Sequence, residues 1–295
     1  MRNYNVIVLG GGGIKCISTL GALQYLYDNT DIYSQVKTFI GTSAGAIISL
    51  LLVIGYTPIE ITVYICTHNV LGSLLPFDFF SLMKGLGALK FERLETHLRY
   101  MIELKTGKKQ CTLLELYEKF NKTVVCTSYN LTNNTCEYIS HETHPNIDCV
   151  TAVRASASIP FVFDECLIDN NVYVDGGVVD NFPIHLCKED DTVFGCVIFT
   201  KYNNLDRQYR ILSILRVLST LSSNFYIKRI LRCCNTQNMD ILEINLQDID
   251  MFDFDKHQSS ILSLYTDGYN KCHTFFTNNV NETNIQMDSN TNSRE

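Results

Sequence analysis

Short apolar runs and helical periodicity alternate in the N-terminal part of the chain. Residues 6–9 (Val-Ile-Val-Leu) form an uninterrupted apolar run, which is typical of a strand buried on both faces. Four glycines, residues 10–13, join this run to a segment with apolar side chains at helical spacing, residues 14–27. A second strand is predicted over 36–40, and an apolar helix over 47–54. This alternation predicts an α/β fold in which helices flank a mostly parallel central sheet.

The same alternation continues to residue 276. Further helices are predicted from Pro58 onward and over 91–102, 113–120, 149–157, 206–234 and 256–276. Further strands are predicted over 123–128, 136–139, 166–168, 172–174, 192–200 and 241–244, the first two pairs as hairpins. Because no linker divides the chain, residues 1–276 are predicted to form one domain. Residues 277–295 are polar and rich in Asn and Thr, and are predicted to be a disordered tail.

Residues 71–89 differ from the rest of the pattern. They combine clustered aromatic and apolar side chains with Gly85 and Gly87, and only Asp78 and Lys84 are charged. One interpretation is a lid or lipid-contacting flap, since glycine permits hinging and aromatic clusters suit an acyl chain or a membrane interface. The alternative interpretation is an irregular piece of core.

Composition narrows the class of protein. The 295 residues are 46% hydrophobic and 19% charged, which is enough for a sizeable core. The net charge of −7 gives no indication of a nucleic-acid partner. Twelve cysteines include no Cys-x-x-Cys pair and no zinc-like Cys/His spacing, so no metal site is expected. The chain enters a strand directly after its start, so no signal peptide is expected; we predict a cytoplasmic protein with reduced thiols.

A candidate nucleophile lies between the second strand and the apolar helix, in Gly41-Thr42-Ser43-Ala44-Gly45. Gly-x-Ser-x-Gly in a strand–turn–helix context is the pattern of a nucleophile elbow, where a strained turn exposes the central serine. The flanking glycines let strand and helix approach each other without Cβ clashes. Ser43 is therefore the predicted nucleophile.

The glycine run between the first strand and helix has the geometry of an anion-binding loop. A dinucleotide fingerprint fails because its last glycine would fall on Lys15 or Cys16, and a phosphate-binding P-loop lacks its Gly-Lys-Ser/Thr. The remaining interpretations are a tight turn and an oxyanion hole formed by the amides of Gly11, Gly12 and Gly13. We favour the oxyanion hole, since four consecutive glycines are entropically costly for a turn alone.

An exposed serine needs a base, and two schemes are open. A Ser–Asp–His triad would use His185, His257 or His273, but none of these lies in a short loop directly after a strand. A Ser–Asp dyad would use Asp175, at a strand end with two glycines behind it that allow another backbone to come close. We favour the dyad of Ser43 and Asp175.

Four segments, in this order, resemble the motifs of the patatin-like phospholipase family of lipid acyl hydrolases. They are residues 11–15 (Gly-Gly-Gly-Ile-Lys), the elbow, residues 155–163 (Ala-Ser-Ala-Ser-Ile-Pro-Phe-Val-Phe) and residues 174–183 (Val-Asp-Gly-Gly-Val-Val-Asp-Asn-Phe-Pro). The departures are Cys16, where the family usually has glycine, and Gly10, where it usually has Asp or Ser. A positive φ at Cys16 would disturb the oxyanion hole, whereas ordinary helical backbone would tolerate this residue.

The resemblance implies a three-layer patatin-like fold and a phospholipid or other acyl-lipid substrate. It implies Ser43 as nucleophile, Asp175 as general base and an oxyanion hole around Gly11 to Gly13, with no catalytic histidine, metal or cofactor. Transient contact with a membrane surface is expected, and Lys15 is a candidate contact for a lipid headgroup. The alternatives are an α/β-hydrolase-type esterase with a histidine triad, and a lipid-binding protein without catalysis.

Overall fold

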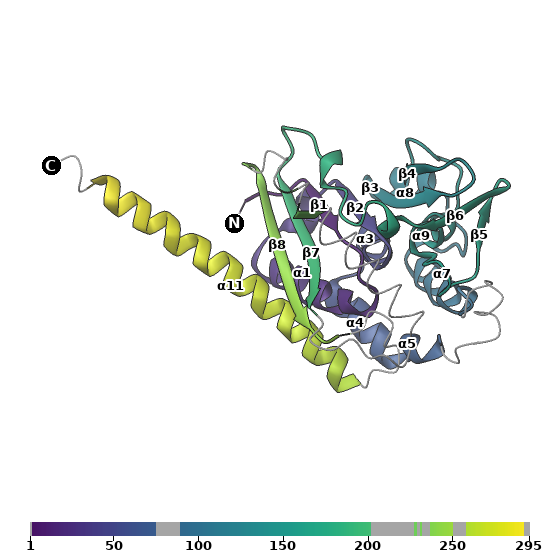
Figure 1. The fold of residues 1–295 in the computed structure, drawn as a ribbon, viewed down its shortest axis with the longest axis horizontal. Helices are drawn as coiled ribbons and strands as arrows, with labels where there is room; N and C mark the ends of the chain where they lie inside the picture. Colours follow the sequence, from purple (N-terminus) through teal and green to yellow (C-terminus); the bar gives the residue numbers. More distant parts are fainter. Residues whose placement is uncertain are drawn as a thin grey trace.

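An eight-stranded mixed sheet forms the centre of the fold, with helices packed against it (Figure 1). The structure, a computed structural model, describes residues 2–74, 89–201, 227–228, 231, 237–249 and 258–291, with side chains up to residue 278. The strands are β1 (Val6–Leu9), β2 (Thr38–Thr42), β3 (Thr123–Asn130), β4 (Thr135–Ile139), β5 (Cys166–Ile168), β6 (Asn171–Asp175), β7 (Val193–Lys201) and β8 (Met239–Gln247). Their order is β5-β6-β3-β2-β1-β7-β8, with β4 also paired to β3. The predicted α/β class is confirmed.

The parallel part of the sheet separates two hydrophobic cores. β3, β2, β1, β7 and β8 are parallel neighbours. Alternate residues of β1 point to opposite faces: Ile7 and Leu9 join the larger core, while Val6 and Val8 join the smaller one. Burial on both faces explains why this strand reads as a continuous apolar run.

The helices follow the sequence pattern closely. They are α1 (Ile17–Asn29), α2 (Ile32–Gln35), α3 (Ala44–Val53), α4 (Pro58–Thr67), α5 (Val70–Ser73), α7 (Glu92–Thr106), α8 (Leu113–Phe120), α9 (Cys149–Ala157) and α11 (Gln258–Thr291), with 3-10 turns η1 (Gly13–Cys16), η2 (Gly176–Val178) and η3 (Ile184–Leu186). Capping boxes begin α4 and α8, formed by Thr57 with Glu60 and by Thr112 with Glu115.

β2 and β6 lie end to end along one edge of β3. β2 pairs with β3 up to Thr42, which lies opposite Thr127, and β6 pairs with it from Asp175, which lies opposite Ser128. β4 pairs with residues 126–130 of β3 and therefore occupies the other edge. Because β2 is parallel and β6 antiparallel to β3, the carboxyl ends of β2 and β6 meet at this junction.

The last helix differs from its predicted bounds. It was expected over 256–276, but α11 continues to Thr291, into the segment predicted to be a disordered tail. In Figure 1 its C-terminal part extends beyond the rest of the fold. The predicted flap lies outside the described residues between 75 and 88, as does most of the helix predicted over 206–234.

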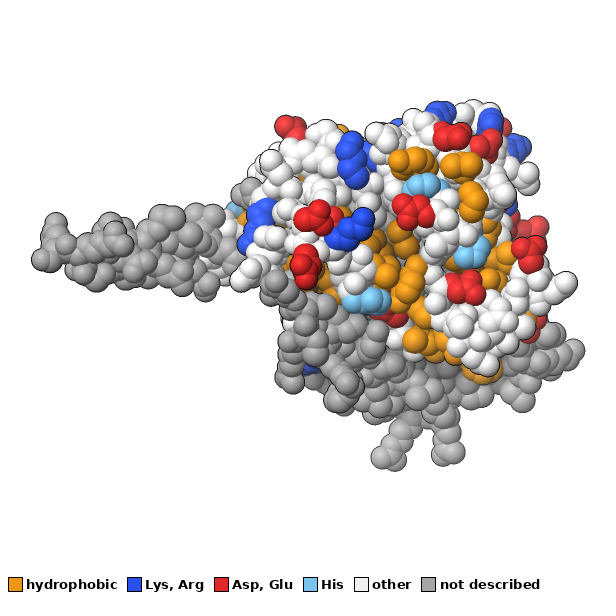
Figure 2. Space-filling view, turned by 90° about the horizontal axis from the view of Figure 1, so that it is seen from above, with side chains coloured by type: hydrophobic (Ala, Val, Ile, Leu, Met, Phe, Trp, Pro, Cys, Tyr) orange, Lys and Arg blue, Asp and Glu red, His pale blue; other side chains and the backbone are white. Residues whose placement is uncertain are grey.

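The surface carries charges of both signs. Figure 2 shows acidic and basic side chains interspersed on one face, with hydrophobic side chains reaching the surface in patches between them.

Among the described helices none is by itself both long and apolar enough to cross a membrane. α3 and α4 reach that length and apolar character only as a pair, which bends by 116°.

Two glycines allow α1 and α11 to cross in backbone contact. A Cβ on Gly268 would lie 1.8 Å from the carbonyl oxygen of Ser18, and a Cβ on Gly21 would lie 1.8 Å from that of Tyr265. No side chain can move aside to relieve such a clash, because the groups that approach are backbone atoms. The glycines therefore fix how closely α11 packs on the helix that follows the glycine loop.

We predict that Gly268→Ala destabilises the protein, although an alanine in an open helix would stabilise it by about 1 kcal/mol. Forcing the two helices apart is expected to lower the free energy of unfolding by about 2 kcal/mol or more. Denaturant titration of wild type, Gly268→Ala and the exposed control Ser263→Ala on the same helix measures this effect. Equal stability of the two variants would contradict the crossing.

Candidate active site

Ser43 occupies the strained elbow that the sequence predicts. Its φ of 56° and ψ of −125° lie in a region that non-glycine residues rarely adopt. A Cβ on Gly41 would lie 2.5 Å from the Ala46 nitrogen, and one on Gly45 would lie 2.4 Å from the Leu9 carbonyl oxygen. The two glycines thus allow β2, α3 and β1 to converge around the serine, as predicted.

The junction on β3 brings Asp175 to Ser43. Asp175 is the last residue of β6 and is almost fully buried. Burial raises the pKa of its carboxyl group to about 6, although hydrogen bonding from the Ser43 side chain and the Gly177 amide lowers it. The Gly177 amide donates to Oδ1 of Asp175 at 2.7 Å. The structure therefore combines a serine hydroxyl with a carboxyl group that titrates near neutral pH.

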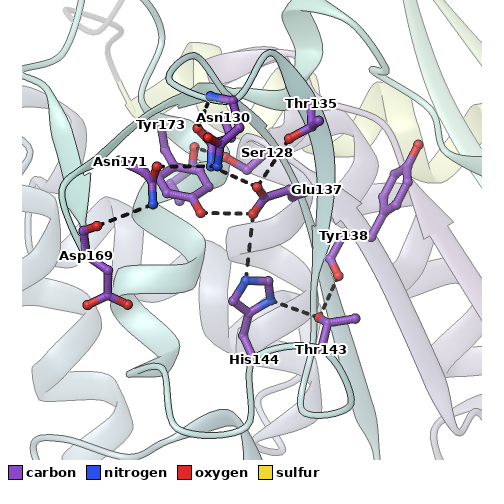
Figure 3. A network of polar contacts seen from close by, with 12 residues as sticks. Ser128, Asn130, Thr135, Glu137, Tyr138, Thr143, His144, Asp169, Asn171 and Tyr173 are labelled. Atoms are coloured by element: carbon purple, nitrogen blue, oxygen red, sulfur yellow. Dashed lines mark hydrogen bonds and ion pairs between the residues drawn. The ribbon is translucent and has the colours of Figure 1, made fainter.

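A network of polar contacts anchors the strand that carries Asp175 (Figure 3). Glu137 of β4 accepts hydrogen bonds from the Tyr173 hydroxyl of β6 at 2.9 Å and from the Asn130 amide of β3 at 2.8 Å. His144 Nε2 lies 3.7 Å from the same carboxylate. Because Tyr173 is two residues before Asp175, these contacts fix β6 close to the site.

Two serines attach α9 to the junction. The Ser156 hydroxyl donates to the Thr127 carbonyl at 2.6 Å and accepts from the Ser43 amide at 3.0 Å. The Ser128 hydroxyl donates to the Ala155 carbonyl at 2.8 Å and to the Val174 carbonyl at 3.2 Å. These hydrogen bonds therefore fix the Ser43 backbone and the end of β6 relative to α9.

The glycine loop lies beside Ser43 and is held there by Asn181. The Gly11 amide donates to Asn181 Oδ1 at 3.1 Å, and Asn181 Nδ2 donates to the Gly11 carbonyl at 3.2 Å. This corrects one part of the prediction, because a Gly11 amide that is already paired is not a free oxyanion donor. Within the described part of the chain, the amides of Gly12 and Gly13 have no acceptor. These two amides remain as the candidate donors.

Cys16 does not disturb the loop. Its φ of −65° is helical, so the position needs no glycine, whereas Gly13 has the positive φ of 58° that favours glycine. Burial raises the pKa of the Cys16 thiol to about 12, so the side chain stays neutral at physiological pH.

Lys15 is placed differently from the prediction. Only 5% of its surface is exposed, and Nζ donates to Thr200 Oγ1 at the end of β7 at 2.8 Å. Burial lowers the pKa of its ammonium group to about 8. Lys15, the candidate headgroup contact, is therefore a buried side chain bonded to the end of β7.

The candidate triad histidines that the structure describes have partners other than Ser43. His185 Nε2 lies 3.1 Å from the Tyr138 hydroxyl, and His185 Nδ1 lies 3.7 Å from the Asp180 carboxylate. His273 of α11 packs edge-on against the Tyr25 ring. The third candidate, His257, lies outside the described residues.

An apolar pocket of about 130 Å³ opens at Ser43. Its wall comes from η1, α1, α3, α4, α5 and α7 and from the segment after α9, including Ile159 and Phe163. Leu71 and Leu74, at the start of the predicted flap, line it, and the Leu89 amide at the other end donates to the Val162 carbonyl at 2.8 Å. The described ends of the flap thus belong to the pocket wall and to its adjoining core.

Two positioning residues were missed by the sequence reasoning, namely Ser156 and Asn181. Both lie within the segments that resemble family motifs, but their roles depend on contacts with residues more than a hundred positions away.

In the part of the chain that the structure describes, no group of three or more His, Cys, Asp or Glu side chains is arranged to hold a metal ion.

Comparison with known sequences finds a matching protein family and related viral proteins. The profile of a family described as patatin-like phospholipase matches residues 7–188. A protein named probable lipid hydrolase 463L, from Invertebrate iridescent virus 6, is 30% identical over 233 residues, which cover 76% of this chain and 74% of that protein. Uncharacterized protein R571 of Acanthamoeba polyphaga mimivirus is 30% identical over 203 residues, covering 68% of this chain and 67% of that one.

Solved structures share the fold. VipD from Legionella pneumophila superimposes with a TM-score of 0.60 at 16% identity, covering 94% of this chain and 67% of VipD. Full-length ExoU from the type III secretion system of Pseudomonas aeruginosa, in complex with SpcU, gives 0.51 at 12% identity, and this chain spans about half of it (53%). At these identities the likeness concerns the fold alone.

We predict that Asp175→Asn stabilises the protein at alkaline pH. The pKa of about 6 in the folded state is above the usual value near 4 in an unfolded chain, so the ionised carboxylate opposes folding. This cost is absent near pH 4, grows as the pH rises to about 6, and amounts to about 3 kcal/mol above it. Urea titration of wild type and Asp175→Asn at several pH values measures the difference in unfolding free energy.

The exposed Asp31→Asn is the matched control for this change of charge. It should show the pH dependence of wild type. If Asp175→Asn also follows the wild-type curve from acid to alkaline pH, the carboxyl pKa is not raised in the folded protein.

Proposed function

This chain belongs to the patatin-like phospholipase family, and from this premise we propose that it is a serine lipid acyl hydrolase acting on fatty-acyl esters. Family membership supports lipid hydrolysis in general. The serine chemistry rests on one observation: Ser43 stands on a strained elbow in the wall of an apolar pocket and interacts with the buried carboxyl group of Asp175.

The first half of the proposed reaction forms an acyl-enzyme. Ser43 Oγ attacks the ester carbonyl carbon while Asp175 accepts the hydroxyl proton. The negative charge that develops on the carbonyl oxygen is stabilised by the amides of Gly12 and Gly13, which have no acceptor within the described residues. The C–O bond to the alcohol then breaks, and Asp175 returns its proton to the leaving oxygen.

The second half regenerates the enzyme. A water molecule loses a proton to Asp175 and attacks the acyl carbon, and the bond to Ser43 Oγ breaks as this oxygen takes the proton back. A fatty acid leaves. A carboxyl pKa of about 6 suits this exchange, because the group is ionised at neutral pH and still basic enough to accept a proton.

The proposed substrate is a phospholipid or another acyl lipid, met by transient contact at a membrane surface in the cytoplasm. The apolar wall of the pocket supports an acyl chain as the bound group. Phe161, between the pocket residues Ile159 and Phe163, is 47% exposed and has a positive φ of 66°, which supports a lipid-facing rim. The buried free thiols of Cys16, Cys111 and Cys126, among others in the described part, support a reducing compartment.

We predict that a fluorophosphonate probe labels wild type at Ser43, because such probes require an activated serine. Ser43→Ala should abolish labelling at this position. Asp175→Asn should slow it by about 10²–10⁴-fold, the usual contribution of a general base. Peptide mapping of the labelled proteins measures both effects.

A well-folded wild-type protein that takes up no probe and hydrolyses no short-chain ester would favour the rival interpretation, a lipid-binding protein without catalysis. Vesicle binding that is unchanged in Ser43→Ala would then be the positive sign of that rival.

We predict that kcat/KM for a soluble ester falls about tenfold per pH unit below pH 6 and levels off above it, because the protonated carboxyl group of Asp175 cannot accept the serine proton. His185→Gln, His257→Gln and His273→Gln should keep most of the wild-type turnover and the same acid limb. A loss of about 10²–10⁴-fold in one of these folded variants would instead favour a histidine triad.

A further inference from the structure

Apart from Ser43 itself, the described wall of the pocket contains one hydrogen-bonded polar pair among mainly apolar side chains. Tyr64 of α4 and His97 of α7 both line it, and the Tyr64 hydroxyl lies 3.1 Å from His97 Nδ1. Each polar group is the other's hydrogen-bond partner, so the pair turns carbon surface toward the cavity. This hydrogen bond joins α4 to α7.

The pocket extends along α3 and α7 from Ser43. Its wall on α3 extends from Ser43 to Leu51, eight residues further along the chain, which is about 12 Å at the rise of an α-helix. On α7 the wall extends to Met101, whose carbonyl accepts from the Tyr56 hydroxyl just beyond the end of α3. His97 is one turn before Met101, so the pair lies toward the part of the wall that Leu51 and Met101 line, away from Ser43.

The pair separates the pocket from solvent. Tyr64 and His97 are both half-buried, and the ring of the exposed His68 stacks on Tyr64 with centroids 4.0 Å apart. One side of this wall is therefore the cavity and the other is the surface. Parting the two helices would break this hydrogen bond, at a modest net cost because water can bond to both groups at the surface.

The pocket has a limited capacity. Its volume of about 130 Å³ is slightly below the roughly 150 Å³ of an apolar protein cavity that accommodates benzene. By this measure, an acyl chain can place about six carbons inside. A longer chain must leave its end outside or pass between α4 and α7.

We propose that the Tyr64–His97 pair determines the acyl-chain length that the enzyme accepts. The pair is the gate between α4 and α7, and while it is closed, catalytic efficiency stops rising with chain length at about six carbons. This inference rests on the proposed function, since it assigns the pocket to the acyl group of the substrate.

The test compares kcat/KM for monomeric p-nitrophenyl butyrate, hexanoate, octanoate and decanoate in wild type, Tyr64→Ala and His97→Ala. The wild-type values should rise to the hexanoate and then level off or fall. In both variants they should continue to rise, by up to about fourfold for each additional methylene that becomes buried. His97→Ala provides an independent result if Tyr64→Ala fails to fold.

His68→Ala is the matched control, because its ring touches Tyr64 from outside but does not line the pocket. It should keep the wild-type chain-length profile. An unchanged profile in folded Tyr64→Ala or His97→Ala, with butyrate still hydrolysed and Ser43 still labelled by a fluorophosphonate, would overturn the gate and leave the proposed function intact. Absence of both hydrolysis and labelling in wild type would overturn the proposed function, and the gate with it.

Discussion

β2 and β6 can share one edge of β3 because β2 ends opposite Thr127 and β6 ends opposite Ser128. At the point where parallel pairing stops, antiparallel pairing from the other direction begins, so two carboxyl ends meet within one residue step of the same strand. Ser43 follows the end of β2, and Asp175 is the end of β6. Other contacts hold this junction together. Ser156 of α9 donates to the Thr127 carbonyl, and Gly176 allows close approach there, because a Cβ on it would lie 2.3 Å from the Thr127 carbonyl oxygen.

The conformation of Ser43 and the burial of Asp175 each cost free energy, and the surrounding structure must offset both costs. Ser43 has an unfavourable backbone conformation, and Asp175 is a carboxyl group removed from water. Neither would persist on a loop that could relax. The hydrogen bonds to Ser156, Gly177 and Asn181, together with the Tyr173–Glu137 contact, hold both conformations, so part of the stability of the fold is spent on keeping the site reactive.

Much of this architecture could be predicted from the sequence, because local patterns determine it. The continuous apolar run of β1, the glycines around Ser43 and the turn residues between β5 and β6 each act within a few residues. What could not be predicted depends on distant contacts. Lys15 looks like a surface cation in the sequence, but its ammonium group donates to Thr200. Gly11 looks like an oxyanion donor, but its amide already donates to Asn181. The end-to-end placement of β2 and β6 likewise depends on strand pairing that no local pattern specifies.

The clamp of Gly11 by Asn181 has a consequence for the order in which the chain is made. Ser43 and its elbow leave the ribosome early, and Asp175 and Asn181 follow more than a hundred residues later. At ordinary rates of translation this delay is roughly ten seconds or more. Until then the elbow lacks the Asp175 carboxyl group, and the glycine loop lacks its hydrogen bonds to Asn181. Synthesis itself therefore delays the assembly of the site until residues 175–181 have been made, so a nascent or prematurely terminated chain shorter than this lacks a complete site.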